Sequence, residues 1–198
     1  MLGRIVAVAA VAAGGLLLKK QLDKSRSGIA SSVEESIEVQ VPVSTAYNQW
    51  TQFEEFPKFM HGVEEVRQLD DTHLHWRARI AGKEEHWHSE ITSQIPDKRI
   101  AWRSTSGPRN SGVVSFEKVT DSSTRITLRM EYEPTGLLEK IGDALGAVKA
   151  EASGNLKRFS EFLESRHRET GAWRGTVRGG SSVTADEAPS TGGVGTNG

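Results

Sequence analysis

The strongest constraint on the fold is a strict alternation of inward and outward residues in two neighbouring segments. The apolar residues of Thr72–Ile80 fall on even positions, and those of Lys83–Thr92 fall on odd positions. A period of two is typical of strands that bury one face. If the two residues between these segments form a tight turn, Trp76 lies opposite Trp87 on the inner face. The sequence therefore predicts an antiparallel hairpin with tryptophans directed into a core.

The remaining pattern extends this hairpin into a larger sheet. Further strands are expected at Glu35–Val41, Val63–Leu69, Arg99–Thr105, Gly112–Val119 and Thr124–Tyr132. Two short helices are expected after the first of these strands, one carrying Trp50 and one over Glu54–Met60. From Leu137 to Leu163 an apolar residue recurs every three or four positions, which marks one long amphipathic helix. This order predicts an α+β fold, a curved antiparallel sheet of about seven strands around a long C-terminal helix.

Several short motifs lie in this order and carry a resemblance. They are Pro42–Ser44 before the helix at Trp50, then Phe53–Met60, Ile100–Trp102 and Gly112–Phe116, followed by the closing helix. In these features the chain resembles the START-like (SRPBCC) superfamily of polyketide cyclase/dehydrase and coenzyme Q-binding proteins, from about Val33 to Arg166. The resemblance implies a helix-grip fold. It also implies a cavity between sheet and helix for a lipid, an isoprenoid quinone or a polycyclic aromatic compound.

The side chains expected to line such a cavity are those that alternation directs inward, together with aromatic residues of the short helices and apolar residues of the closing helix. They are Trp50, Phe56, Phe59, Trp76, Trp87, Ser89, Trp102, Ser104, Phe116, Met130, Tyr132, Ile141 and Leu145. Flat aromatic side chains suit a hydrophobic ligand. The alternative is that these residues simply fill the core.

Catalysis is a second hypothesis, in which the chain is a cyclase or dehydrase. That chemistry needs an acid and a base that face the ligand. Alternation directs nearly every ionisable strand residue outward and leaves a thin inward polar set of Ser89, Ser104, Tyr132 and Glu85. We therefore expect a binding or carrier protein, with no catalytic residue and no cofactor. A third hypothesis is a membrane-associated interaction or stress-response protein with a filled core.

The outward positions of the central hairpin carry histidines. They are His73, His75, His86 and His88. Opposed imidazoles on adjacent strands can share zinc, copper or nickel. The simpler interpretation, which we favour, is a solvated face on which arginine, histidine and glutamate alternate and neutralise one another.

The first residues form an uncharged apolar segment, Ile5–Leu18. As a helix it would be about 21 Å long, shorter than a hydrocarbon core of about 30 Å. We expect a membrane anchor, with a signal peptide and a helix packed on protein as alternatives. Lys19, Lys20 and two further basic residues follow the segment, so the positive-inside rule places the main domain in the cytoplasm.

The composition sets the domain organisation and excludes several classes of function. We expect an anchor at residues 1–24 that contacts the membrane through residues 1–18, a linker at 25–32, the main domain at 33–168, and a disordered glycine- and serine-rich tail at 169–198. The chain has no cysteine, which excludes disulfides and zinc–thiolate or iron–sulfur sites. Its formal net charge of −1 provides no field for holding nucleic acid.

Overall fold

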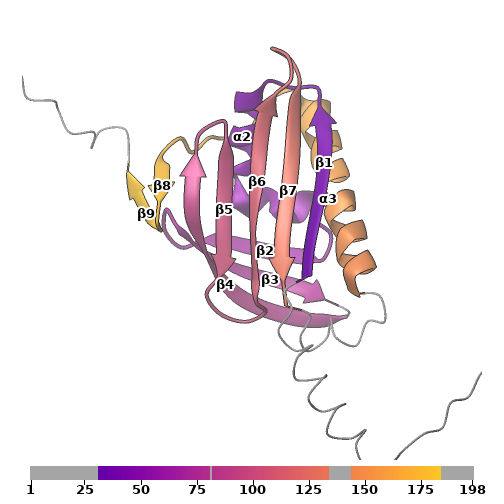
Figure 1. Ribbon diagram of the computed structural model, residues 1–198, viewed down its shortest axis with the longest axis vertical. Coiled ribbons are helices and arrows are strands. Elements are labelled where there is room, and N and C mark those ends of the chain that lie inside the picture. The colour runs from indigo at the N-terminus through magenta and orange to yellow at the C-terminus, as the bar shows by residue number, and fades with distance from the viewer. Residues whose placement is uncertain (1–30, 81, 134–143, 184–198) are drawn as a thin grey trace, which may run out of the picture.

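The computed structural model of the chain describes residues 31–80, 82–133 and 144–183. Within these ranges nine strands form one antiparallel sheet, and a long helix lies along it (Figure 1). The expected anchor, residues 25–30 of the expected linker, residues 184–198 of the expected tail and the helix residue Ile141 lie outside the described residues. No helix in the described ranges is both long enough and apolar enough to cross a bilayer.

Seven strands form the continuous part of the sheet, in the spatial order β1-β7-β6-β5-β4-β3-β2. Their bounds are β1 Ser31–Val39, β2 Val63–Gln68, β3 His73–Ile80, β4 Lys83–Ile95, β5 Arg99–Ser104, β6 Asn110–Lys118 and β7 Thr124–Tyr132. Strands β2 to β7 form a meander, and β1 joins its far edge beside β7. In Figure 1, β2, β3 and β4 run across the direction of β6 and β7, so the sheet is strongly curved. The predicted α+β helix-grip fold is confirmed.

The predicted register of the central hairpin is also confirmed. Trp76 pairs with Trp87, and Arg79 pairs with Glu84 on the opposite face. An apolar pair then lies inside and two residues of opposite charge lie outside, which favours this register over one shifted by a single residue. The side-chain pattern alone was therefore sufficient to align β3 with β4.

Three helices complete the described part of the chain. Helix α2 spans Val43–Trp50, the 3₁₀ helix η1 spans Phe53–Lys58, and helix α3 spans Ala144–Arg166. The two short helices follow β1, as predicted, and close one end of the concave side of the sheet (Figure 1). Helix α3 lies along β1, at the edge of the concave side.

Aromatic rings fill the concave side at the α2 end. The ring centroid of Trp50 lies 4.8 Å from that of Phe159 on α3, 5.7 Å from Phe56 and 6.1 Å from Phe116. Phe59 lies 5.1 Å from Phe159 and 5.3 Å from Phe56. Trp50, Phe56, Phe59 and Phe116 each expose at most 6% of their surface. These rings pack on one another as part of the core at the α2 end, and their lining of a ligand cavity stays a prediction.

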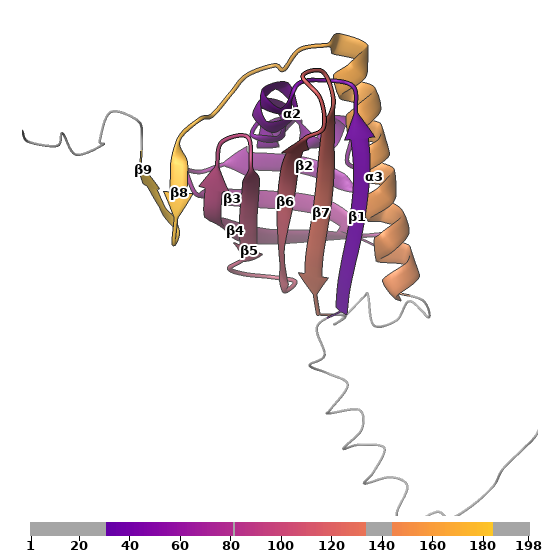
Figure 2. The same cartoon turned by 45° about the horizontal axis from the view of Figure 1, so that its top comes forward.

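The prediction of a disordered tail is wrong for residues 169–183. After α3 the chain passes α2 and forms two short strands, β8 Thr176–Arg178 and β9 Ser181–Val183 (Figure 2). Strand β8 pairs with the end of β4, and Val177 is completely buried there. We call residues 169–183 the C-terminal strap.

Hydrogen bonds to buried amides explain why the strap is ordered despite its low apolar content. Gln49 of α2 accepts a hydrogen bond from the backbone N–H of Thr170 at 2.9 Å. Arg174 binds Asp97 through two bonds of 3.0 and 2.7 Å, a fork geometry that favours one side-chain conformation. Trp173 packs against the core. Gln49 is completely buried, and its bonds to Thr170 satisfy both polar atoms of its side-chain amide.

Candidate functional site

The candidate site is the inner face of the sheet at the end away from α2 (Figure 1). Strands β5 and β7 end there and β6 begins there. The strand pairings place Ser89 beside Ser104, and Asn110 beside Tyr132. These four side chains form a row across the inner face, which we call the polar row. Alternation explains the row, because each member continues the inward positions of its own strand.

Half-buried indoles flank the polar row, Trp102 on one side and the paired Trp76 and Trp87 on the other. We call these three indoles the indole floor. Trp76 and Trp87 stack with their centroids 5.6 Å apart and their planes 3° apart. The indole N–H of Trp76 donates to Ser89 Oγ at 2.8 Å. The floor is thus fixed in orientation by its own hydrogen bond and stacking, as a binding surface for a flat molecule requires.

The ring of Trp102 lies over β6 at Gly112, the one residue of that strand without a side chain. A Cβ atom built on Gly112 would lie 2.6 Å from Cζ2 of the Trp102 ring. The Trp102 N–H donates to Asn110 Oδ1 at 3.3 Å, and Asn110 Nδ2 donates to the carbonyl of Pro108 at 3.1 Å. Both ends of the Asn110 amide are therefore engaged, which fixes the indole beside the polar row.

A pocket of about 450 Å³ opens beside this part of the sheet. It lies at the rim of the sheet, because its walls include Asn110 and Tyr132 of the polar row, the turn around Gly107, and the outward residues Ser111 and Glu131. Arg109 and Glu133 form an ion pair of 3.3 Å among the lining residues. The lining of the pocket is thus polar. The pocket adjoins the indole floor because Asn110, one of its walls, is hydrogen-bonded to Trp102.

Tyr132 has an unusual place in this site. It is 5% exposed, and its hydroxyl is one of two buried side-chain polar atoms that lack a hydrogen-bond partner among the described residues. The other is His75 Nδ1 on the outer face. A buried hydroxyl without a partner costs about 1–3 kcal/mol, so such groups are rare in folded proteins.

Two carboxylates lie on the inner face, and one of them was not predicted. Glu35 occupies the inward position of β1 opposite Leu128, and its carboxylate lies 3.7 Å from Lys149 Nζ of α3. The alternation of Glu35 with Ile37 and Val39 would have revealed it. Glu85 pairs with Ala78, on the inner face as expected. The candidate site is therefore less purely apolar than the sequence suggested.

A buried titratable group lies at the other end of the concave side. Burial raises the pKa of the Tyr47 hydroxyl above its ordinary value. Gln94 Nε2 donates to this hydroxyl at 3.0 Å, and Tyr47 is completely buried in the aromatic core. Tyr47 is therefore part of the packing, not of the candidate site.

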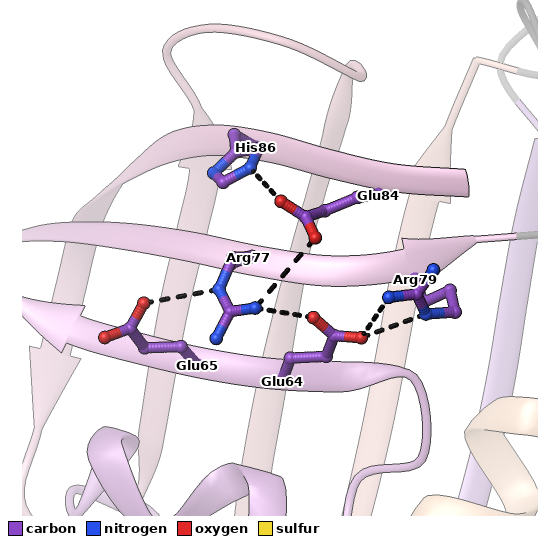
Figure 3. Close-up of polar contacts among 6 residues, drawn as sticks. All are labelled: Glu64, Glu65, Arg77, Arg79, Glu84 and His86. Carbon is purple, nitrogen blue, oxygen red and sulfur yellow. Dashed lines mark hydrogen bonds and ion pairs between the residues drawn. The ribbon is translucent and has the colours of Figure 1, made fainter. Parts of the chain in front are cut away.

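The outer face of the hairpin is an ion-pair network (Figure 3). A register shift between Val63 and Glu65 lets two carboxylates reach Arg77, whose Nη1 lies 2.7 Å from Glu64 and whose Nε lies 3.4 Å from Glu65. His86 binds Glu84 at 2.9 Å on the same face. These contacts agree with the interpretation that we favoured for this face, in which alternating charges neutralise one another.

The histidines do not assemble a metal site in the described ranges, where no three His, Asp or Glu side chains are placed to hold one ion. The ring centroids of His75 and His88 are 5.0 Å apart, but His73 is turned toward Asp70 and His88 toward Ser106. Burial, followed by the nearby positive charge of Arg67, lowers the pKa of His75. The candidate metal site at this face is therefore not supported by the geometry.

The structure brings together about half of the residues that the sequence proposed. Those at the open end are Trp76, Trp87, Ser89, Trp102, Ser104, Met130 and Tyr132. Leu145, expected on the cavity wall, is half exposed at the start of α3. Asn110 and Gly112 were missed, although both continue the inward alternation of β6 through Val114 and Phe116.

Comparison with known proteins agrees with this architecture. Residues 39–161 match the family described as "Polyketide cyclase / dehydrase and lipid transport". An uncharacterised 17.2 kDa protein of Streptomyces lincolnensis, encoded between melC2 and rnhH, is 51% identical over 148 residues, which cover 74% of this chain and 99% of that protein.

Solved structures show the same fold. The Zhui aromatase/cyclase of a Streptomyces species superimposes with a TM-score of 0.61 at 16% identity, over 73% of this chain and 100% of the other. The protein DR_A0006 of Deinococcus radiodurans gives 0.55 at 25% identity, over 69% and 99%. A START superfamily protein of Mycobacterium smegmatis gives 0.54 at 18% identity, over 68% and 95%. With the match to the family model over most of the main domain, these findings identify the chain as a member of the polyketide cyclase/dehydrase and lipid transport family.

Proposed function

We propose that this chain binds a hydrophobic small molecule at the open end of the sheet, on the indole floor and beside the polar row. The observation that carries the proposal is the contrast between the two ends of the concave side. At the α2 end the aromatic rings are buried against one another. At the other end three indoles remain half-buried next to a pocket of about 450 Å³.

The energetics favour a ligand at the open end. Half-buried indoles keep apolar surface in contact with water, and covering it releases about 25 cal/mol per Å². Trp102 and the stacked Trp76 and Trp87 are already held in place by neighbours, so little side-chain entropy is lost on binding. The family description, which includes lipid transport, supports a hydrophobic ligand.

Carriage of the ligand, without chemical change, is the form of this proposal that we favour. A cyclisation or dehydration needs an acid and a base at the reacting atoms. The polar row holds hydroxyl and amide groups, and the inward carboxylate of Glu35 is paired with Lys149. The other inward carboxylate, Glu85, lies four residues along β4 from Ser89 of the polar row.

The proposal is tested by titrating the full chain with a neutral apolar probe, 2-isopropenylnaphthalene, in a calorimeter. Trp102→Ala should weaken binding about tenfold or more, since it removes part of the floor. Trp173→Ala is the matched control, because Trp173 is also half-buried on the core but lies in the strap. If the wild-type chain does not bind the probe, or if both variants lose binding equally, the proposed site is refuted.

We also propose that the main domain is held at the cytoplasmic face of a membrane by the segment Ile5–Leu18. The uncharged segment between Arg4 and Lys19 supports this, as does the excess of basic residues after it. Tethering would raise the effective concentration of the domain where hydrophobic ligands reside. The full chain should sediment with membranes, and a chain that starts at Ser31 should stay in the supernatant. Equal distribution of the two would refute the tether.

A further inference from the structure

We infer that Tyr132 is the specificity-determining residue of the proposed site, and that the ligand carries a carbonyl oxygen which accepts a hydrogen bond from the Tyr132 hydroxyl. This inference rests on the proposed function, because it names the chemical class of the molecule bound there. It predicts that flat apolar ketones and quinones bind better than hydrocarbons of the same shape.

The first argument is the absence of a partner for Tyr132 in the described part of the chain. Its Oη atom is buried and makes no hydrogen bond there. The only other tyrosine, Tyr47, is also buried, but its hydroxyl accepts a hydrogen bond from Gln94. Burying an unpaired hydroxyl destabilises the free protein. A ligand oxygen that pairs with it would recover this free energy on binding.

The second argument is that the nearest polar neighbours are already engaged. Asn110 faces Tyr132 across the strand pair, but its amide is used by Trp102 and by the carbonyl of Pro108. Ser104 Oγ accepts the backbone N–H of Asn110 at 3.0 Å. Asn110 and Ser104 are therefore hydrogen-bonded within the protein, whereas the Tyr132 hydroxyl is available to a ligand.

The third argument concerns position and access. Tyr132 lines the pocket and lies two residues from Met130, which is half-buried beside Gly112 on the same face. A methionine side chain is flexible and changes its conformation at low cost, so a shift of Met130 can open the way to the hydroxyl. A flat ligand on the Trp102 indole would then place an oxygen near Tyr132.

The donor strength of the Tyr132 phenol favours a ligand that carries a carbonyl oxygen. A neutral phenol is a strong hydrogen-bond donor and a weak acceptor, so its best partner is an acceptor oxygen. A site built to pair a hydroxyl rejects an analogue that lacks the partner atom, since the buried group is then left unsatisfied. The inference therefore concerns specificity as well as affinity.

The test compares two probes of the same shape, 2-acetylnaphthalene and 2-isopropenylnaphthalene, which differ by a carbonyl oxygen in place of a methylene group. The full wild-type chain should bind the ketone about five- to tenfold more tightly, as expected for one buried hydrogen bond. In Tyr132→Phe the two probes should bind equally, at about the wild-type affinity for the hydrocarbon. Tyr47→Phe is the matched control and should keep the preference for the ketone.

The results separate the inference from the proposed function. If the wild-type chain binds both probes equally, or if Tyr132→Phe keeps the preference, the inference is overturned while the proposed site stands. If the wild-type chain does not bind 2-isopropenylnaphthalene, the proposed function itself fails, and the inference with it.

A measurement without any ligand gives a second readout. Removing an unpaired hydroxyl loses no hydrogen bond, so Tyr132→Phe should unfold at the same temperature as the wild type or higher. A clearly lower unfolding temperature, or failure to fold, would mean that the hydroxyl has a partner within the protein. That result would also overturn the inference.

Discussion

The indole of Trp102 occupies the space in which a side chain at Gly112 would lie. A Cβ atom at Gly112 would come within 2.6 Å of the ring and within 2.6 Å of the carbonyl oxygen of Arg129. The two residues face each other in the register of β5 and β6. The absence of a side chain on one strand thus allows a large ring on the next strand to lie flat, and this places the floor of the proposed site.

Gly112→Ala should therefore destabilise the fold and displace the indole. We expect a loss of about 1–3 kcal/mol in the free energy of unfolding, as is typical of overpacking. Urea denaturation measures the loss, and the tryptophan emission should shift to longer wavelength as the ring becomes exposed. The neighbouring Ser111→Ala, on the other face, serves as control and should change the free energy by less than about 0.5 kcal/mol. An alanine variant with unchanged stability and emission would contradict this account.

Removal of the C-terminal strap should destabilise the main domain. A chain that ends at Arg168 loses the buried Val177, the Arg174–Asp97 pair and the partner of Gln49. The expected cost is about 3 kcal/mol, since a buried apolar side chain contributes about 1.5–3 kcal/mol and the buried amides lose their partners.

A chain that ends at Val183 is the control for this truncation. It retains all contacts of the strap described above, so its unfolding temperature should match that of the full chain. If both truncated chains were as stable as the full chain, the strap would contribute nothing to the fold. If both were destabilised equally, the stabilising contacts would lie beyond Val183.

The strands of the main sheet could be predicted because each carries a clear period of two. The hairpin at Trp76 and Trp87 is the best case, since its register followed from side-chain alternation alone. The strap could not be predicted in this way. Its stability comes from hydrogen bonds between its own backbone and distant amides such as that of Gln49. Contacts between positions so far apart in the sequence leave no local pattern.

The candidate site could be predicted only in part, because it too depends on contacts between residues far apart in the sequence. Alternation correctly placed Trp102 and Tyr132 on the inner face, but it could not show which inward residues pack on one another. Phe116 and Trp102 have the same pattern in the sequence, yet the first is buried under Trp50 and the second is half-buried at the open end. The difference arises because α2 and η1 cover only one end of the sheet.

The hydrogen bond between Tyr47 and Gln94 should contribute to stability. Both side chains are buried, and Tyr47→Phe leaves the Gln94 amide without its partner. We expect a loss of about 1–3 kcal/mol, measured by urea denaturation. In the double variant with Gln94→Met, the second change should cost less than it does alone, because both partners are then apolar. Strictly additive losses would show that the two groups do not interact.

Asp70 should make the stability of the protein depend on pH in the acid range. Its carboxylate accepts backbone hydrogen bonds from Thr72 and His73, each at 2.8 Å. The Thr72 bond, followed by those from His73, lowers the pKa of Asp70 from 3.8 to about 2. The carboxylate is therefore ionised in the folded chain at pH values where it is already protonated in the unfolded chain.

The sign of the effect follows from this lowered pKa. The stabilisation by Asp70 is complete above a pH of about 4 and is lost as the pH falls through about 2. A shift of this size corresponds to about 2.4 kcal/mol, but the Asp70 side chain is 57% exposed. Solvent screening should reduce the contribution to about 1 kcal/mol. Asp70→Asn should thus be less stable than the wild type at neutral pH, and the difference should shrink toward low pH.

Urea denaturation of both chains at a series of pH values measures this difference. Asp71→Asn is the control, since that adjacent carboxylate accepts a side-chain hydrogen bond from Ser182 and is not held by the turn that fixes Asp70. Because Asp71→Asn removes one negative charge from the position next to Asp70, it corrects the series for the change in net charge. A gap between wild type and Asp70→Asn that stays constant down to a pH of about 2 would show that the turn does not favour the ionised carboxylate, because protonation would then cost nothing in the folded state.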